Sequence, residues 1–189
     1  MSKLKPILCS ITAVIALLGD GGVGNSTLPI GNVVIAGESQ GKLKLTYKGL
    51  KLIGDYEGCR LDAYRCPAGY KTNGVGNIHN IKKDIIDNKQ VAKDWVSNIQ
   101  QAESCLNNIL GNNKVTSGQY DALTSFIFNT GCKRFLRNKD LTETKISLYV
   151  KNGKLPLACM QLSRWVYGGG KKLKGLVKRR MSEYSRCIE

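Results

Sequence analysis

Apolar residues recur with the period of an α-helix from residue 87 onward, and this pattern constrains the fold more than any other feature of the sequence. Val91, Trp95, Ile99 and Ala102 are separated by four, four and three residues, so they share one face of a helix. We therefore expect a long amphipathic helix over residues 87–110, ended by the glycine that follows it.

Shorter helices are expected on the C-terminal side of the long one. Thr116 or Ser117 is a suitable N-terminal cap for a helix that ends at Gly131. Helical patterns also occupy residues 142–152, 155–167 and 174–186. We see neither an internal repeat nor a second domain of comparable size.

The stretch before the long helix combines one short helix with strands and turns. Thr46 can cap a helix that buries Leu50 and Ile53, and Glu57 follows four residues later on the same face. In residues 61–77, Tyr, Pro, Asn and Gly alternate with apolar residues, which is typical of short strands and turns. The predicted fold class is therefore α+β, with a small antiparallel β-sheet lobe and a larger helical lobe.

The composition describes a folded, basic protein. At 189 residues, with 42% hydrophobic and 23% charged residues, the chain can bury a real core, which excludes a disordered polycation. Lys and Arg number 29 against 14 Asp and Glu, a formal net charge of +15. Because the chain has one histidine and no Cys-x-x-Cys pair, we expect no metal site and no cofactor.

The N-terminus has the features of an export segment. Lys3 and Lys5 precede an uncharged run over residues 6–19, which is short for a membrane span and is followed by an acid where a signal peptidase would cut. The run is either an ordinary cleaved secretory signal or a segment that enters a membrane and later leaves it, and the two alternatives stay open. Both send the rest of the chain to an oxidising compartment outside the cytoplasm.

The predicted organisation has three parts. Residues 1–24 form the N-terminal segment, residues 25–45 form a linker, and residues 46–189 form the main domain. The linker is expected because the chain from Gly19 to about Gly41 is rich in Gly, Ser and Asn.

One segment of twenty residues is specific enough to indicate a family. Glu57 is followed nine residues later by Cys66, then by Thr72 and by the glycines 74 and 76. This resembles the signature of phage-type lysozymes, glycoside hydrolase family 24: Glu, eight residues, Asp, five residues, Thr, then Gly-x-Gly. Cys66 replaces the aspartate, as in the subgroup of signal-anchor-release (SAR) endolysins. Further similarity lies in ALTSFIFNTGC (122–132), QLSRW (161–165) and GLVKRR (175–180).

The resemblance implies a lysozyme-like fold and gives each residue of the segment a role. Glycoside hydrolysis needs an acid that protonates the leaving oxygen, which would be Glu57, and a second group across the sugar, which would be Cys66 as a thiolate near Arg60 or Arg65. Thr72 would hold the attacking water. Inversion through that water and a covalent thiolate intermediate both remain open.

Two other residues of this region receive lesser roles. Asp62 is an acid inside the segment, but it lies four positions before the aspartate position and ranks well below Cys66 as the second group. His79 is expected to be a buried, hydrogen-bonded structural histidine rather than a catalytic one.

The seven cysteines divide into four structural and three regulatory ones. The resemblance implies a bridge between Cys159 and Cys187, and Cys105 can then bridge to Cys132. The regulatory cysteines are Cys9, Cys59 and Cys66.

The regulatory set can exchange one bridge for another. With Cys9 in the membrane, Cys59 and Cys66 would pair and block the catalytic thiol. After release, Cys9 would attack Cys59 and free Cys66 by thiol–disulfide exchange.

These observations predict an endolysin that cleaves peptidoglycan between N-acetylmuramic acid and N-acetylglucosamine and lyses the host. It would be a monomer, held at the host inner membrane and then released into the periplasm. The seven cations of residues 171–186 suit an anionic wall and membrane rather than nucleic acid. The alternatives are a conventionally secreted lysozyme and a non-catalytic basic module that binds cell wall or nucleic acid on a lysozyme-like fold.

Overall fold

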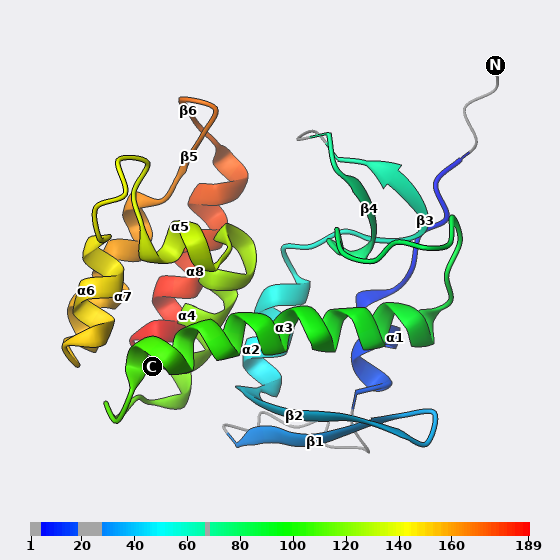
Figure 1. The fold of residues 1–189 in the computed structure, drawn as a ribbon, viewed down its shortest axis with the longest axis horizontal. Coiled ribbons are helices and arrows are strands. Elements are labelled where there is room, and N and C mark those ends of the chain that lie inside the picture. The colour runs from blue at the N-terminus through cyan, green and yellow to red at the C-terminus, as the bar shows by residue number, and fades with distance from the viewer. Residues whose placement is uncertain (1–4, 19–27, 67–68) are drawn as a thin grey trace.

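The computed structural model describes residues 5–18, 28–66 and 69–189. Its longest helix, α3 (Asn88–Leu110), crosses the molecule and carries elements on both sides (Figure 1). The side chain of Asp87 caps α3 by accepting a hydrogen bond from the Gln90 N–H, and the helix ends at Gly111. The predicted amphipathic helix is confirmed, including both of its ends.

The helical lobe gathers around one end of α3 and contains the C-terminus (Figure 1). Thr116 caps its first helix in a capping box with Gln119, as the sequence predicts. The elements of this lobe are α4 (Ser117–Thr130), α5 (Cys132–Leu136), α6 (Lys145–Lys151), α7 (Leu155–Gln161), a 3-10 helix (Leu162–Arg164), the strands β5 (Tyr167–Gly168) and β6 (Lys171–Lys172), and α8 (Lys174–Cys187).

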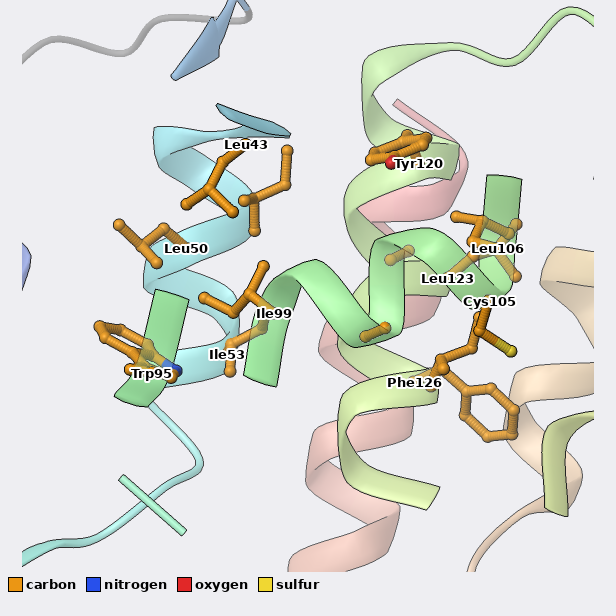
Figure 2. Close-up of a cluster of buried hydrophobic side chains, with 14 of the residues drawn as sticks. Leu43, Leu50, Ile53, Trp95, Ile99, Cys105, Leu106, Tyr120, Leu123 and Phe126 are labelled. Carbon is orange, nitrogen blue, oxygen red and sulfur yellow. The ribbon is translucent and has the colours of Figure 1, made fainter. Parts of the chain in front are cut away.

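The main core forms where α2 (Tyr47–Gly54), α3 and α4 meet (Figure 2). Thr46 caps α2, which buries Leu50 and Ile53 as predicted. These side chains lie against Trp95 and Ile99 of α3 in a cluster of buried apolar side chains, whose removal from water is the main stabilising term of the fold.

A β-hairpin occupies most of the predicted linker. Strands β1 (Pro29–Ile35) and β2 (Glu38–Thr46) pair antiparallel, and Val33, Ile35, Leu43 and Leu45 are buried in the core. Each pair of buried residues is two positions apart, the period of a strand with one face on a core. The expectation of a linker over residues 25–45 is therefore wrong from residue 29 onward. The predicted boundary at residue 24 lies outside the described residues.

The N-terminal segment packs onto the rest of the protein. Its helix α1 (Ile11–Ala16) is capped by Ser10 and buries Val14 and Ile15. Leu18 is 1% exposed. A Cβ atom at Gly54 would lie 2.6 Å from a methyl group of Ile11, so only glycine permits this approach of α1 to α2. No helix in the described ranges is long and apolar enough to span a membrane.

A second hairpin, formed by β3 (Cys59–Arg65) and β4 (Lys71–Val75), lies away from the helical lobe (Figure 1). The N-terminal segment runs along β3. The Cys9 N–H donates to the Cys59 carbonyl at 3.1 Å, and the Leu61 N–H donates to the Ile7 carbonyl at 2.8 Å.

Three disulfides tie these parts together. Cys105–Cys132 joins α3 to α5, and Cys159–Cys187 joins α7 to α8, as the resemblance implies. Cys9–Cys59 joins the N-terminal segment to β3. Cys66 lies outside these three bridges.

Candidate active site

Glu57 lies in the short connection between α2 and β3, at the wall of a cleft. Its backbone N–H donates to the Gly54 carbonyl at 3.1 Å, which continues the last turn of α2. Its carboxylate Oε1 lies 2.6 Å from Nη1 of Arg179 in α8. The side chain is 19% exposed, so it reaches the cleft while an ion pair from the helical lobe fixes it.

A buried charged cluster supports this ion pair from behind. Arg179 Nε lies 3.1 Å from Oε1 of Glu183, and that same oxygen accepts a hydrogen bond from Ser125 Oγ at 2.8 Å. Arg180 lies on the other side of Glu183, with Nε 2.9 Å from Oε2. Burial raises the pKa of Glu183, and the two arginines oppose that shift. Burial lowers the pKa of Arg180 to about 10.

The cleft has a volume of about 400 Å³. Its walls come from the connection after β4, from α3 and from the junction of α4 with α5. A Cβ atom at Gly76 (φ +64°) would lie 3.2 Å from Oε2 of Glu57, so glycine is needed beside the acid. The lining residues are Glu57, Gly76, Ile78, His79, Asn98, Gln101, Ala102, Ile127, Phe128, Asn129, Thr130, Gly131 and Cys132.

The β3–β4 hairpin carries the other two predicted site residues. Cys66 directly follows β3 and is half-buried, and its backbone N–H donates to the Tyr70 carbonyl at 2.9 Å. Thr72 in β4 is buried, and its hydroxyl donates to the same carbonyl at 3.0 Å. One carbonyl thus links both residues, while the described lining of the cleft includes neither of them.

Tyr64 connects the two halves of the candidate site electrostatically. Burial raises the pKa of Tyr64, and Arg60 opposes this shift. Cys66 and Glu57 both raise that pKa further through their charges. The phenol therefore lies within electrostatic reach of both predicted catalytic groups.

Comparison with known proteins identifies the family. Residues 54–183 match the family model described as phage lysozyme. The chain belongs to the phage lysozyme family. It is 35% identical over 156 residues to the SAR-endolysin of Haemophilus phage HP1, which covers 79% of this chain and 84% of that protein. The family and these relatives make the chain an enzyme of the lysozyme type with a lysozyme-like fold, as predicted.

Two solved structures of one relative differ in how well they match this lysozyme. The active form of the phage P1 endolysin Lyz matches with a TM-score of 0.76 at 31% identity, over 97% of this chain and 96% of that chain. The secreted inactive form of Lyz matches with a TM-score of 0.53 at 31% identity, over 76% of this chain and 94% of that chain. This lysozyme is thus more similar to the structure of the active form of Lyz, and the similarity extends over nearly its whole length.

The cations named beside Cys66 in the sequence make other contacts in this lysozyme. Arg60 forms an ion pair with Asp62, and its guanidinium lies 4.3 Å from the centre of the Tyr64 ring. Arg65 donates to the Gly69 carbonyl at 3.0 Å, within the turn that Cys66 begins. Stabilisation of a Cys66 thiolate by either arginine stays a prediction.

Asp62 has a structural contact that the sequence did not indicate. Its Oδ1 accepts a hydrogen bond from the Ile7 N–H at 2.8 Å, so it fixes the N-terminal segment beside β3. The hydrogen bond from Arg60 holds the pKa of Asp62 below its ordinary value. Asp62 therefore serves as an anchor for the N-terminal segment.

The expectation that His79 is buried is wrong, whereas its lack of a catalytic role stays a prediction. His79 is exposed and lines the cleft. The buried polar side chain of this connection is Asn77, which accepts hydrogen bonds from the His79 N–H at 3.1 Å and from Asn98 Nδ2 at 3.3 Å. The sequence reasoning missed it because an amide that follows Gly-x-Gly looks like a turn residue.

The seven cations of residues 171–186 do not all lie at the surface, where an anionic wall could contact them. Four cations of the region are exposed lysines, but Arg179, Arg180 and Arg186 are buried. The available signal was Glu183, the single acid in residues 171–186, which follows Arg179 by four residues and Arg180 by three.

Within the described ranges, no group of three His, Cys, Asp or Glu side chains is placed to hold a metal ion.

Proposed function

We propose that this lysozyme hydrolyses the β-1,4 bond between N-acetylmuramic acid and N-acetylglucosamine in peptidoglycan and thereby lyses a bacterial host. The observation that carries the proposal is the position of Glu57, whose carboxylate is fixed at the wall of a cleft by Arg179. The relatives named as endolysins support the substrate class. A glycan chain bound in this cleft would pass Glu57.

Each proposed catalytic residue has a role in the reaction. Glu57 protonates the oxygen of the leaving sugar as the glycosidic bond breaks. On the opposite face of the ring, the Cys66 thiolate either stabilises the developing positive charge while Thr72 holds the attacking water, or it attacks the anomeric carbon itself. Both courses end with water adding to the anomeric carbon and a proton returning to solvent or to Glu57.

We infer that disulfide exchange controls this activity. In the stored state Cys59 would pair with Cys66. After release, the Cys9 thiolate attacks Cys59 Sγ, the Cys9–Cys59 bond forms, and Cys66 leaves as a thiolate, so one disulfide replaces another without an external oxidant. The Cys9–Cys59 bridge and the better match to the active form of the phage P1 endolysin both support this scheme.

The proposed location follows from the same scheme. The protein is held in the host inner membrane by its N-terminal segment, faces the periplasm, and acts there as a monomer after release. The relatives named SAR-endolysin support this location. Peptidoglycan is the proposed substrate, and its anionic character suits the exposed lysines of α8.

Turbidity loss of chloroform-permeabilised bacteria tests the catalytic proposal. We expect Glu57→Gln to abolish lysis, because the amide has no proton to give to the leaving oxygen. The matched control is Asp55→Asn, which changes a carboxylate two residues away whose ion-pair partner is Lys51, and it should lyse at the wild-type rate. Lysis by Glu57→Gln at the wild-type rate would overturn the proposed chemistry.

The redox proposal is tested with two further variants. Cys9→Ser should be exported and folded but inactive, because Cys59 then keeps Cys66 in a disulfide. Adding Cys66→Asp, the family's usual residue at this position, should restore lysis without any exchange. Full activity of Cys9→Ser alone, or no recovery in the double variant, would contradict the switch.

A further inference from the structure

Asn129 lies near the end of α4, where its exposed side chain lines the cleft that contains Glu57. The Nη2 of Arg180 donates a hydrogen bond to the amide oxygen of Asn129 at 2.7 Å. A guanidinium has only donors, so the amide must present its oxygen to Arg180. The orientation of the Asn129 amide is therefore set by chemistry and cannot be reversed.

This orientation turns the amide nitrogen away from the arginine. Asn129 Nδ2 carries two N–H donors, and it donates to no group in the described part of the chain. Because the side chain is exposed at the cleft wall, these donors are available to a bound molecule. The amide nitrogen can only donate hydrogen bonds, so it is complementary to an oxygen that can only accept them.

Arg180 is itself rigidly held. Its side chain is 1% exposed and its guanidinium lies 4.7 Å from the centre of the Phe126 ring. Its Nη2 also donates to Oε1 of Glu183 at 3.2 Å. Glu183 binds Arg179 as well, and Arg179 fixes Glu57. One buried carboxylate thus orients the proposed acid and a second polar group on the same cleft.

We propose that Asn129 Nδ2 donates a hydrogen bond to the carbonyl oxygen of an acetamido group of the bound glycan, and that Arg180 is the positioning residue for this contact. The inference rests on the proposed function and names the substrate group that the cleft selects. An acetamido carbonyl accepts but does not donate, whereas a sugar hydroxyl does both. Asn129 therefore favours N-acetylated amino sugars over their deacetylated forms.

The test compares hydrolysis of peptidoglycan with hydrolysis of the same polymer after chemical de-N-acetylation. Wild type should prefer the acetylated polymer by about five- to ten-fold in kcat/KM through this contact, the effect of one hydrogen bond. In Asn129→Asp, the carboxylate still accepts from Arg180 but has no donor for the carbonyl. We expect this variant to fold normally and its preference to fall to about one or to reverse, because the deacetylated sugar carries an ammonium group.

Gln101→Glu is the matched control, since it places the same change of charge on another amide that lines the cleft. It should keep most of the preference for the acetylated polymer, because it adds a charge but leaves the Asn129 donor in place, so any decrease measures the effect of the charge alone. Arg180→Lys removes the fixed donor to Asn129 and should lose the preference. The preference is the ratio of kcat/KM for the two polymers, and a simple loss of stability does not change this ratio. Asn129→Asp decides the proposal by itself, even where the buried Arg180 variant fails to fold.

Two results would overturn the inference. Either Asn129→Asp retains the wild-type preference, or Gln101→Glu loses the preference to the same extent. Failure of the proposed function looks different, because wild type would then release no sugar from either polymer.

Discussion

Glu57 and Cys66 are nine residues apart in the chain, yet different parts of the molecule hold them. Glu57 is fixed by Arg179 from α8, which is fixed in turn by the buried carboxylate of Glu183. Cys66 is held by backbone hydrogen bonds in the turn between β3 and β4. The N-terminal segment lies along β3 through Cys9–Cys59 and backbone hydrogen bonds.

Because their supports differ, the surroundings of Cys66 can rearrange with the N-terminal segment more readily than those of Glu57. The side-chain contacts that fix the Glu57 carboxylate come from α8 and α4, and among the described residues none of these contacts involves the N-terminal segment. The hairpin that carries Cys66 contacts that segment directly. Rearrangement of the N-terminal segment would therefore reshape the thiol side while the acid keeps its support.

Removing Glu183, the buried carboxylate behind Glu57 and Arg179, should have the largest effect on stability. Glu183→Ala leaves two buried arginines without their carboxylate, which we expect to cost about 3–5 kcal/mol in the free energy of unfolding. Glu38→Ala is the control, because its carboxylate is 67% exposed and pairs with Lys93 at the surface, so its loss should cost less than about 1 kcal/mol. Denaturant unfolding measures both, and equal losses would mean that the cluster does not support Glu57.

The next largest effect concerns the N-terminal segment as part of the core. Leu18→Ala should cost about 2–5 kcal/mol, because it empties a site that is 1% exposed. Leu8→Ala, at a side chain that is 70% exposed, should change the free energy of unfolding by less than about 0.5 kcal/mol. If thermal unfolding finds both variants equal to wild type, the segment does not pack as described.

A smaller effect is expected at the anchor between Asp62 and the segment. Asp62→Ala removes the acceptor of the Ile7 N–H and the partner of Arg60, and should cost about 1–3 kcal/mol. Hydrogen exchange of the Ile7 amide should become faster, whereas Asp55→Ala, at an exposed surface pair, should leave it unchanged. Unchanged exchange in Asp62→Ala would show that the disulfide alone holds the segment.

The smallest effect is the pH dependence of the same contact. The folded protein holds the pKa of Asp62 below its ordinary value, chiefly through Arg60. The ionised carboxylate therefore contributes its stability in full above the ordinary pKa of about 3.9 and loses it as the pH falls through the lowered folded pKa. The protection of the Ile7 amide, which is its exchange rate relative to that of an unstructured amide at the same pH, should fall only in that acid range, and a loss of protection near neutral pH would point to another group.

Local signals predicted most helices of this protein, although the helix expected over residues 155–167 is α7 (Leu155–Gln161) followed by a 3-10 helix and by Tyr167 in β5. Thr46 caps α2 as predicted, Thr116 is the cap among the two candidates Thr116 and Ser117, and Gly111 ends α3. Such signals act within one turn of the chain, so the sequence displays them directly. The motif of residues 57–76 likewise identified the family, which the family model then confirmed.

The errors share a different cause, since each depends on contacts between distant residues. Glycine-rich composition hid the β1–β2 hairpin, whose buried side chains gain their environment from α2, α3 and α4. The contacts of Arg179 and Arg180 with the candidate site could not be predicted, because their partners Glu57 and Asn129 lie 122 and 51 positions away. No periodicity in α8 could show that a cluster around Glu183 supports the candidate site.

The backbone pairing of residues 7–9 with β3 also bears on the behaviour of the chain before this segment docks. The hairpin has only two strands, and the segment supplies the partner for the outer side of β3 at Cys59 and Leu61. Residues 84–86 pair with the rest of this side. Without the segment, the Cys59 carbonyl and the Leu61 N–H would be unpaired and open to another extended chain, and such exposed edges are a common route to aggregation. By covering this edge with its own residues, the protein protects itself from association with neighbouring copies.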